Sequence, residues 1–163
     1  MALELYRIDD RLIHGQVVVG WGQPLDLRFI VLVDEEVAAS DWEQELYRMG
    51  VPPEMEVYFE SLADAAARLA EHQRDPRPGL LLTGDIDTMA RLVEATRAIP
   101  SVNLGGIHHK TGRVQRLRYV FLSPSEEGAL RELSRGGVEV TAQDVPAARP
   151  LPLEEVLTGE GNR

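Results

Sequence analysis

The segment RIDDRLIHGQV, residues 7–17, holds two arginines, two aspartates and a histidine between two apolar runs. His14 precedes the predicted start of a helix, whose first backbone N–H groups lack helical partners and are able to bind an anion. Arg11 adds a permanent cation whose planar fork suits a phosphoryl group. The N–H groups in question belong to Gly15, Gln16 and Val17.

A histidine in an anion-binding loop is suited to accept a phosphoryl group covalently. A neutral imidazole nitrogen is a good nucleophile near pH 7, and a nearby arginine disfavours the charged imidazolium form. Asp9 or Asp10 would either fix the ring tautomer or orient the arginine. Arg11 and the free amides would stabilise charge on the transferring oxygens. The alternative is an ordinary loop histidine among solvated charges.

Composition limits the classes of function. A chain of 163 residues with 44% hydrophobic content predicts one domain with a full core. The net charge of −10 argues against a nucleic-acid partner. No cysteine is present, which excludes disulfides and thiolate metal sites. No signal-like segment or membrane span stands out, so we expect a cytoplasmic protein without direct membrane insertion.

Strand-like and helix-like segments alternate along the chain. Apolar runs predict strands at 3–8, 28–33, 56–59, 79–84, 101–106 and 119–122, and an alternating run predicts an edge strand at 138–143. Helical spacing and capping residues predict helices between them: a short one after Gly15, one from Asp34 to Gly50, one from Ser61, one after Asp85 and one from Ser123 to Gly136.

This order predicts a single-domain, three-layer α/β/α fold. Its mostly parallel sheet has about seven strands and an antiparallel edge strand, with helices on both faces. The domain spans residues 1–157, and its Pro-rich last part forms a tether with at most one helix turn. Residues 158–163 then form a flexible tail.

The ligand site of such a sheet lies at the carboxyl ends of its strands. The loops at 9–15, 34–36, 83–86 and 105–112 should therefore share one edge. Gly105 and Gly106 indicate close backbone approach or a positive φ. Capping of the next helix is favoured over phosphate contact for Thr83, Gly84 and Asp85. The residues expected to support the site from nearby are Arg7, Asp9, Thr83, Gly84, Gly106 and His108.

Other candidate residues have ordinary explanations. His108 and His109 are neighbours without a third ligand close in sequence, so we predict no metal site. Their segment, 108–113, either adds positive charge beside the first loop or forms an exposed hairpin. Trp21 and Trp42 fall on helical stripes and are assigned to the core. No dinucleotide fingerprint or Walker A pattern occurs, so we expect no cofactor.

RIDDRLIHGQV resembles the signature of the IIB components of the mannose/sorbose class of the bacterial phosphoenolpyruvate-dependent sugar phosphotransferase system. IVLVDEEVA, SVNLGGIHHKTG, RLRYVFLSPSE and LRELSRGGVEV resemble later segments, and the similarity covers residues 3–157. The resemblance implies a protein-N(π)-phosphohistidine–sugar phosphotransferase in which His14 is phosphorylated on its δ nitrogen. Arg11 would act with it, and Arg7 is either a phosphate ligand or structural. The implied phosphate-binding set is Asp10, Gly15, Gln16 and Val17.

The resemblance also implies partners. A phosphorylated IIA protein would be the donor, as a separate polypeptide because this chain starts with its first strand. Membrane subunits IIC and IID would hold the sugar, and the chain would associate peripherally with this permease. The main alternative is a regulatory phosphohistidine module that signals transport status without moving sugar. A pure anion-binding domain and a metabolite-binding enzyme are two further alternatives.

Overall fold

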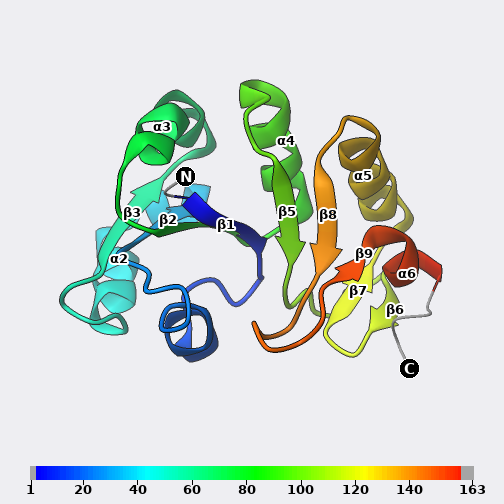
Figure 1. Ribbon diagram of the computed structural model, residues 1–163, viewed down its shortest axis with the longest axis horizontal. Helices are drawn as coiled ribbons and strands as arrows, with labels where there is room; N and C mark the ends of the chain where they lie inside the picture. The colour runs from blue at the N-terminus through cyan, green and yellow to red at the C-terminus, as the bar shows by residue number, and fades with distance from the viewer. Residues whose placement is uncertain (1–2, 159–163) are drawn as a thin grey trace.

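The computed structural model describes residues 3–158, and seven strands form its main sheet (Figure 1). Their order is β3-β2-β4-β1-β5-β8-β9, and every pairing is parallel except β8 with β9. The strands are β1 (Leu3–Ile8), β2 (Phe29–Val33), β3 (Glu56–Glu60), β4 (Gly79–Thr83), β5 (Ser101–Leu104), β8 (Glu139–Ala142) and β9 (Leu151–Pro152). The expected mostly parallel sheet with an antiparallel edge is confirmed.

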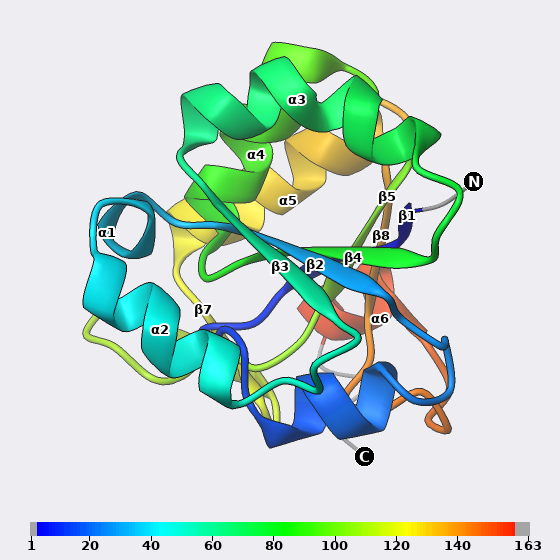
Figure 2. The ribbon, with the colours of Figure 1, turned by 90° about the vertical axis from the view of Figure 1, so that its left-hand side faces the viewer.

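Helices cover both faces of this sheet (Figure 2). One face carries η1 (Gln16–Trp21), a π-helix, with α1 (Glu35–Ala38) and α2 (Asp41–Met49). The other carries α3 (Leu62–Arg74), α4 (Ile86–Thr96) and α5 (Pro124–Arg135), and α6 (Leu153–Thr158) follows β9. Alternate residues of β2 serve the two cores, because successive strand side chains point to opposite faces. The three-layer arrangement is therefore confirmed.

The single helix expected from Asp34 to Gly50 is instead two helices. Asp34 caps α1 by accepting from the Val37 N–H, but α1 stops at Ala38. The Ser40 side chain then accepts from the Glu43 N–H and starts α2. Serine competes for backbone donors in this way, so it favours a helix start over a helix interior.

Three further expectations about elements are corrected. Residues 119–122 contain β7 (Val120–Leu122), which pairs with β6 (Val114–Leu117) in a separate two-stranded sheet. The strand at 138–143 is internal, because β9 pairs along its outer side. The expected tether contains β9 and α6, whose Leu153 and Val156 are buried. Of the predicted tail, Thr158 ends α6, and residues 159–163 lie outside the described residues.

The two tryptophans have different surroundings. Trp21 is buried, as expected, whereas the prediction for Trp42 is wrong because this residue is 68% exposed. The helical stripe that contains Trp42 is apolar, but it faces away from the sheet. Among residues 3–158, no helix has the length and apolar character needed to cross a bilayer.

Candidate functional site

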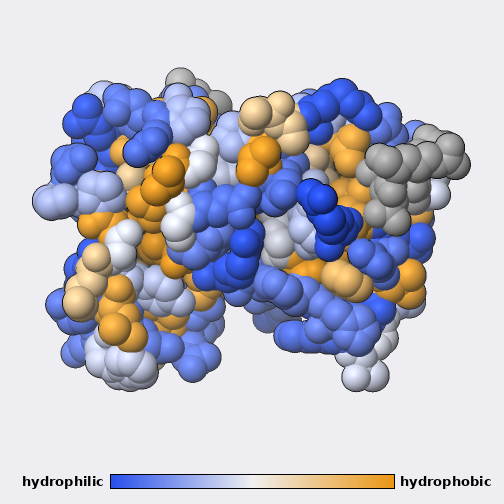
Figure 3. Space-filling model, turned by 90° about the horizontal axis from the view of Figure 1, so that it is seen from below, coloured by the Kyte–Doolittle hydropathy of each residue, from blue (hydrophilic) through white to orange (hydrophobic). Residues whose placement is uncertain are grey.

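The candidate site lies at the carboxyl edge of the sheet, the edge toward which β5 and β8 run in Figure 1 and which Figure 3 faces. Strand β1 stands between β4 and β5, so its following loop is central. The Asp9 N–H donates to the Thr83 carbonyl, and the Asp10 N–H donates to the Gly106 carbonyl, both at 2.9 Å. Three of the predicted loops therefore meet, and the fourth, 34–36, begins α1 beyond β4.

The Asp9 carboxylate is the buried centre of the site. Its side chain has no exposed surface, and its Oδ2 lies 3.5 Å from Arg7, 3.1 Å from Arg11 and 3.5 Å from Nε2 of His14. Burial by itself raises the pKa of this carboxyl. The contacts with His14, Arg11 and Arg7 outweigh burial and hold the pKa of Asp9 well below its ordinary value of 3.8. Asp9 is therefore a permanent anion at neutral pH.

The two ring nitrogens of His14 have different environments. Nδ1 accepts from the backbone N–H of Gln16 at 3.2 Å, at the start of η1. Nε2 is buried, and 3.5 Å separates it from the Asp9 carboxylate, an ion-pair distance rather than a short hydrogen bond. These contacts favour the tautomer with its proton on Nε2 and a lone pair on Nδ1. The side chain is 18% exposed.

The Arg11 guanidinium forms one wall of the site. Its Nε and NH2 donate to the two oxygens of Asp9 at 3.1 Å, and its NH1 donates to Oε1 of Gln16 at 3.2 Å. The hydrogen bond with Asp9 raises the pKa of Arg11. Nε2 of Gln16 donates to the backbone carbonyl of Asp144 at 3.3 Å and to Oδ1 of Asp144 at 3.4 Å. Within residues 3–158, the N–H groups of Gly15 and Val17 have no hydrogen-bond partner.

Arg7 lies beneath the site and links several elements of the structure. It is fully buried, donates to Oδ1 of Asn103, and donates to the carbonyls of Gln143 and Asp144 at 2.8 and 3.3 Å. Its guanidinium also stacks 4.7 Å from the centre of the Trp21 ring. Arg7 therefore holds β1, β5, η1 and the loop after β8 together, which favours the structural of its two predicted roles.

Glycines allow these groups to approach the backbone. A Cβ on Gly105 would lie 2.4 Å from NH2 of Arg7 and 2.7 Å from Oδ2 of Asp9. A Cβ on Gly106 would lie 3.4 Å from Asp9 and from Arg11. The expectation of close approach is confirmed here, and neither glycine has a positive φ. Leu12, within the loop itself, has φ +58° and takes the space that the missing side chain of Gly84 leaves.

Asp10 and His108 face each other beside the site. The Asp10 carboxylate accepts from the His108 N–H at 2.7 Å and contacts Nδ1 of His108 at 2.6 Å. Asp10 was expected among the phosphate ligands, but its carboxylate holds the loop after β5. His108 thus lies beside the first loop, as expected, while His109 stacks edge-on against Phe121.

Thr83 and Asp85 organise the loop after β4. Asp85 caps α4 by accepting from the Thr88 N–H at 2.6 Å. Thr83 is buried, and its hydroxyl donates to the Asp85 carbonyl at 3.1 Å, so its proton is used within this loop. The expectation of capping is confirmed for Asp85.

Sequence reasoning missed three supporting residues: Asn103, Gln143 and Asp144. Gln143 and Asp144 follow β8, whose neighbours in the sheet could not be read from a short alternating run. Asn103 is a buried polar residue in the strand predicted at 101–106, and its polarity within that strand was the available signal.

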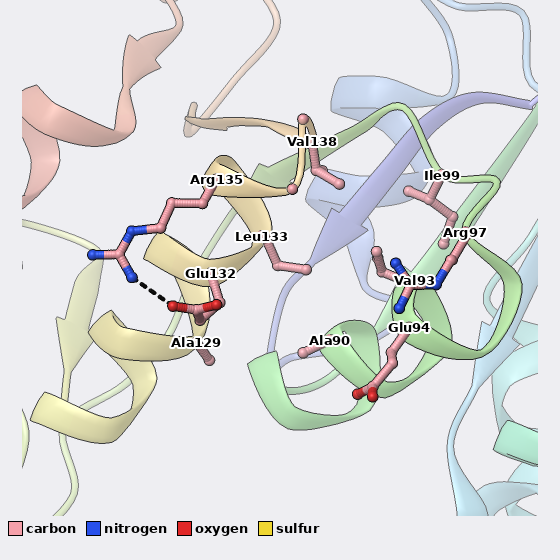
Figure 4. Close-up of a pocket in the computed structure, with 12 residues that line it drawn as sticks. Ala90, Val93, Glu94, Arg97, Ile99, Ala129, Glu132, Leu133, Arg135 and Val138 are labelled. Atoms are coloured by element: carbon pink, nitrogen blue, oxygen red, sulfur yellow. Dashed lines mark hydrogen bonds and ion pairs between the residues drawn. The ribbon is translucent and has the colours of Figure 1, made fainter.

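A cavity of about 830 Å³ lies elsewhere, between α4 and α5 (Figure 4). Its lining includes the buried Val93, Leu133 and Val138 and the exposed Arg97 and Glu94. Val138 precedes β8, so this cavity opens at the amino edge of the sheet, opposite His14. Its lining contains no histidine, and it takes no part in the candidate site.

Comparison with known proteins gives consistent matches. Residues 3–163 match the family described as PTS system sorbose subfamily IIB component, where PTS is the phosphotransferase system. The chain is 33% identical over 141 residues to the PTS system sorbose-specific EIIB component of Klebsiella pneumoniae, covering 86% of this chain and 85% of that protein. It is 30% identical over 162 residues to the PTS system mannose-specific EIIAB component of Escherichia coli K12, covering 97% of this chain but 49% of that longer protein.

A solved structure extends the match to three dimensions. The crystal structure of the IIBSor domain of the sorbose permease from Klebsiella pneumoniae superposes with a TM-score of 0.86 at 29% identity. The superposition covers 97% of this chain and 98% of that one. The fold is therefore shared along 97% of this chain.

Proposed function

The chain belongs to the sorbose subfamily of phosphotransferase system IIB components, and we propose that it carries the phosphoryl group on Nδ1 of His14. A IIB component is a phosphocarrier of the sugar phosphotransferase system. The observation that carries the proposal is the asymmetry of the His14 ring. Nε2 is buried against a permanent anion, whereas Nδ1 lies at the start of η1.

The loading step exchanges one nitrogen–phosphorus bond for another. The lone pair of Nδ1 attacks phosphorus on the phosphohistidine of a IIA protein, and the bond to the donor ring breaks. The electron pair of that bond returns to the donor nitrogen, so no proton needs to move. In the second step, the oxygen of a sugar hydroxyl attacks the same phosphorus, and the hydroxyl proton is released as Nδ1 recovers its lone pair.

Asp9 positions the His14 imidazole and compensates the positive charge that develops on this ring. As Nδ1 binds phosphorus, positive charge develops on the imidazole and its Nε2–H. The Asp9 carboxylate, 3.5 Å from Nε2, stabilises that charge and keeps the ring from turning. Because the low pKa of Asp9 keeps it ionised, this support is present throughout the neutral pH range.

Arg11 and the backbone hold the phosphoryl oxygens. Arg11 and His14 share the same Asp9 oxygen, so the guanidinium lies beside the ring that becomes phosphorylated. The free N–H groups of Gly15 and Val17 supply further donors, and the Gln16 N–H is released as its acceptor Nδ1 binds phosphorus. Asp10 is not part of this set, because its carboxylate faces His108.

The partners follow from the family. We assign the donor role to a phosphorylated IIA protein and the acceptor role to a sugar held by membrane subunits IIC and IID, with the chain acting at the cytoplasmic face. His14, whose side chain is 18% exposed, lies in the loop after β1 at the carboxyl edge of the sheet, outside the cavity between α4 and α5. A residue that meets two proteins in turn requires such a position.

The test is phosphorylation of the purified chain by a phosphorylated IIA protein. Wild type should gain one phosphoryl group that is labile in acid and stable in base, and His14→Ala should gain none. His108→Ala is the matched control, because it removes a more exposed histidine beside the same loop, and it should be labelled like wild type. Labelling of His14→Ala would reject the proposal.

A further inference from the structure

Helix α2 exposes an apolar stripe. Trp42 is 68% exposed, Leu46 53% and Met49 81%. Their spacing, four residues and then three, places them on one face of the helix. We call these three residues the α2 stripe. No residue of α2 is fully buried, so the most apolar face of the helix points to solvent.

The helix is attached through its other side. The Gln44 side chain donates to the carbonyls of Val37 and Ala38 at 3.1 and 3.2 Å. The Tyr47 ring lies 6.4 Å from the Phe59 ring, and the Arg48 guanidinium lies 5.0 Å from it. These contacts come from the side of α2 away from the α2 stripe, whose three side chains are each more than half exposed. An apolar stripe of this kind indicates a surface that another molecule covers.

The α2 stripe begins at the same edge as His14. Helix α1 follows the carboxyl end of β2, and α2 starts after the two residues that follow α1. Helices α2 and η1 both cover the face that includes Ile13, Val17 and Tyr47. Figure 3, which faces this edge, shows apolar surface on the side of α2 and η1, next to a hydrophilic centre. A partner that reaches His14 is therefore able to contact the α2 stripe as well.

Acidic residues frame the α2 stripe. A helix turns about 100° per residue, so Asp41 and Glu45 flank Trp42 on one side and Glu43 flanks it on the other. The one cationic residue of α2, Arg48, is paired with Glu45 at 3.4 Å. The chain itself carries a net charge of −10. This surface fits an apolar ridge bordered by Lys and Arg, and it repels anionic lipid headgroups.

We propose that the α2 stripe docks the chain onto the cytoplasmic face of the membrane permease subunits. The inference rests on the proposed function, because only a phosphocarrier needs to meet the permease. Cytoplasmic loops of membrane proteins carry an excess of Lys and Arg, which complements the acidic frame. An exposed tryptophan within an apolar stripe is the side chain that most often dominates the energy of an interface.

The test measures binding to inside-out vesicles that contain the IIC and IID subunits of the organism that carries this chain. Vesicles without these subunits serve as the blank. The variant Trp42→Ser with Leu46→Ser and Met49→Ser should bind at least about tenfold more weakly than wild type. Val114→Ser is the matched control, because Val114 is 55% exposed on β6, away from α2, and it should bind like wild type. His14→Ala should also bind, since docking does not require the phosphoryl group.

Each outcome decides between occupants. Phosphorylation of the triple variant by a phosphorylated IIA protein should proceed at the wild-type rate, which separates docking from the proposed function. Slower phosphorylation with unchanged vesicle binding would assign the α2 stripe to the IIA donor and overturn the proposal. A wild-type dimer that the triple variant converts to a monomer would assign it to a second copy and also overturn it. Equal binding of wild type to vesicles with and without IIC and IID would also overturn the proposal.

Discussion

Nε2 of His14 lies 3.5 Å from Oδ2 of Asp9, a carboxylate with no exposed surface. The same oxygen meets Arg7 and Arg11, so one buried anion orients the imidazole and both guanidinium groups. The loop after β1 therefore surrounds a charged group that has no exposed surface. Its removal should affect folding and phosphoryl transfer together.

Asp9→Asn keeps the shape of the side chain and removes its charge. Two arginines, one of them fully buried, then lack their counter-ion, and we expect the free energy of unfolding to fall by about 3 kcal/mol. Loss of the group that orients His14 should slow phosphorylation on the order of 100-fold. Urea unfolding and the initial rate with a phosphorylated IIA protein measure the two effects.

Asp10→Asn is the control for that substitution. Asp10 contacts His108, whose side chain is 68% exposed, and such surface contacts contribute at most about 1 kcal/mol. Its stability and transfer rate should stay near the wild-type values. An effect equal to that of Asp9→Asn would show that negative charge in the loop matters, rather than the position of Asp9.

The contribution of Asp9 to stability depends on pH in a defined direction. The folded state lowers the pKa of this carboxyl below 3.8, so the unfolded chain binds the proton more readily. The stabilisation is complete above the ordinary carboxyl pKa and is lost as pH falls below it. The difference in unfolding free energy between wild type and Asp9→Asn should be constant from about pH 8 to 5 and shrink below about pH 4. A difference that grows on acidification would contradict this account.

Gly105→Ala tests the close approach beneath the site. The new Cβ would overlap Arg7 and Asp9, at 2.4 and 2.7 Å, and we expect a loss of about 2 kcal/mol of stability together with slower transfer. Gly128→Ala is the matched control, because nothing lies within 4 Å of its Cβ in α5. Thermal unfolding should show this control equal to wild type or more stable by up to about 1 kcal/mol.

Arg11→Lys keeps the positive charge and removes the planar guanidinium with its forked N–H donors. Arg11 contacts Asp9 and Gln16 at once, and an ammonium group cannot hold both contacts in the same plane. Transfer from the IIA donor should slow by about tenfold or more, with the unfolding curve nearly unchanged. An unchanged rate would remove Arg11 from the set that holds the phosphoryl group.

Much of the sheet could be predicted because its strands are continuous apolar runs. Residues 29–33 and 79–83 are buried throughout, as parallel strands between two helical layers require. The position of His14 followed from the same logic, since parallel strands present their carboxyl-end loops at one edge. The sequence left Asp9 and Asp10 as alternative partners of His14 and Arg11, and only the structure shows that Asp9 contacts both while Asp10 faces His108.

Other features had no signal in the sequence. Helical spacing shows that Trp42, Leu46 and Met49 share a face, but not whether anything covers that face. The residue types of η1 do not distinguish its π-helical form, because its short sequence satisfies an α-helical spacing equally well. Strand β9 has two residues, one of them Pro152, and is fixed by its pairing with β8.

The most direct test of the central claim identifies the phosphorylated ring nitrogen. Nitrogen-15 NMR of the chain, labelled in its histidines and loaded by a phosphorylated IIA protein, distinguishes the two positions. We predict phosphorus bonded to Nδ1 of His14, with the proton retained on Nε2. Phosphorus on Nε2, or on a residue other than His14, would contradict the account.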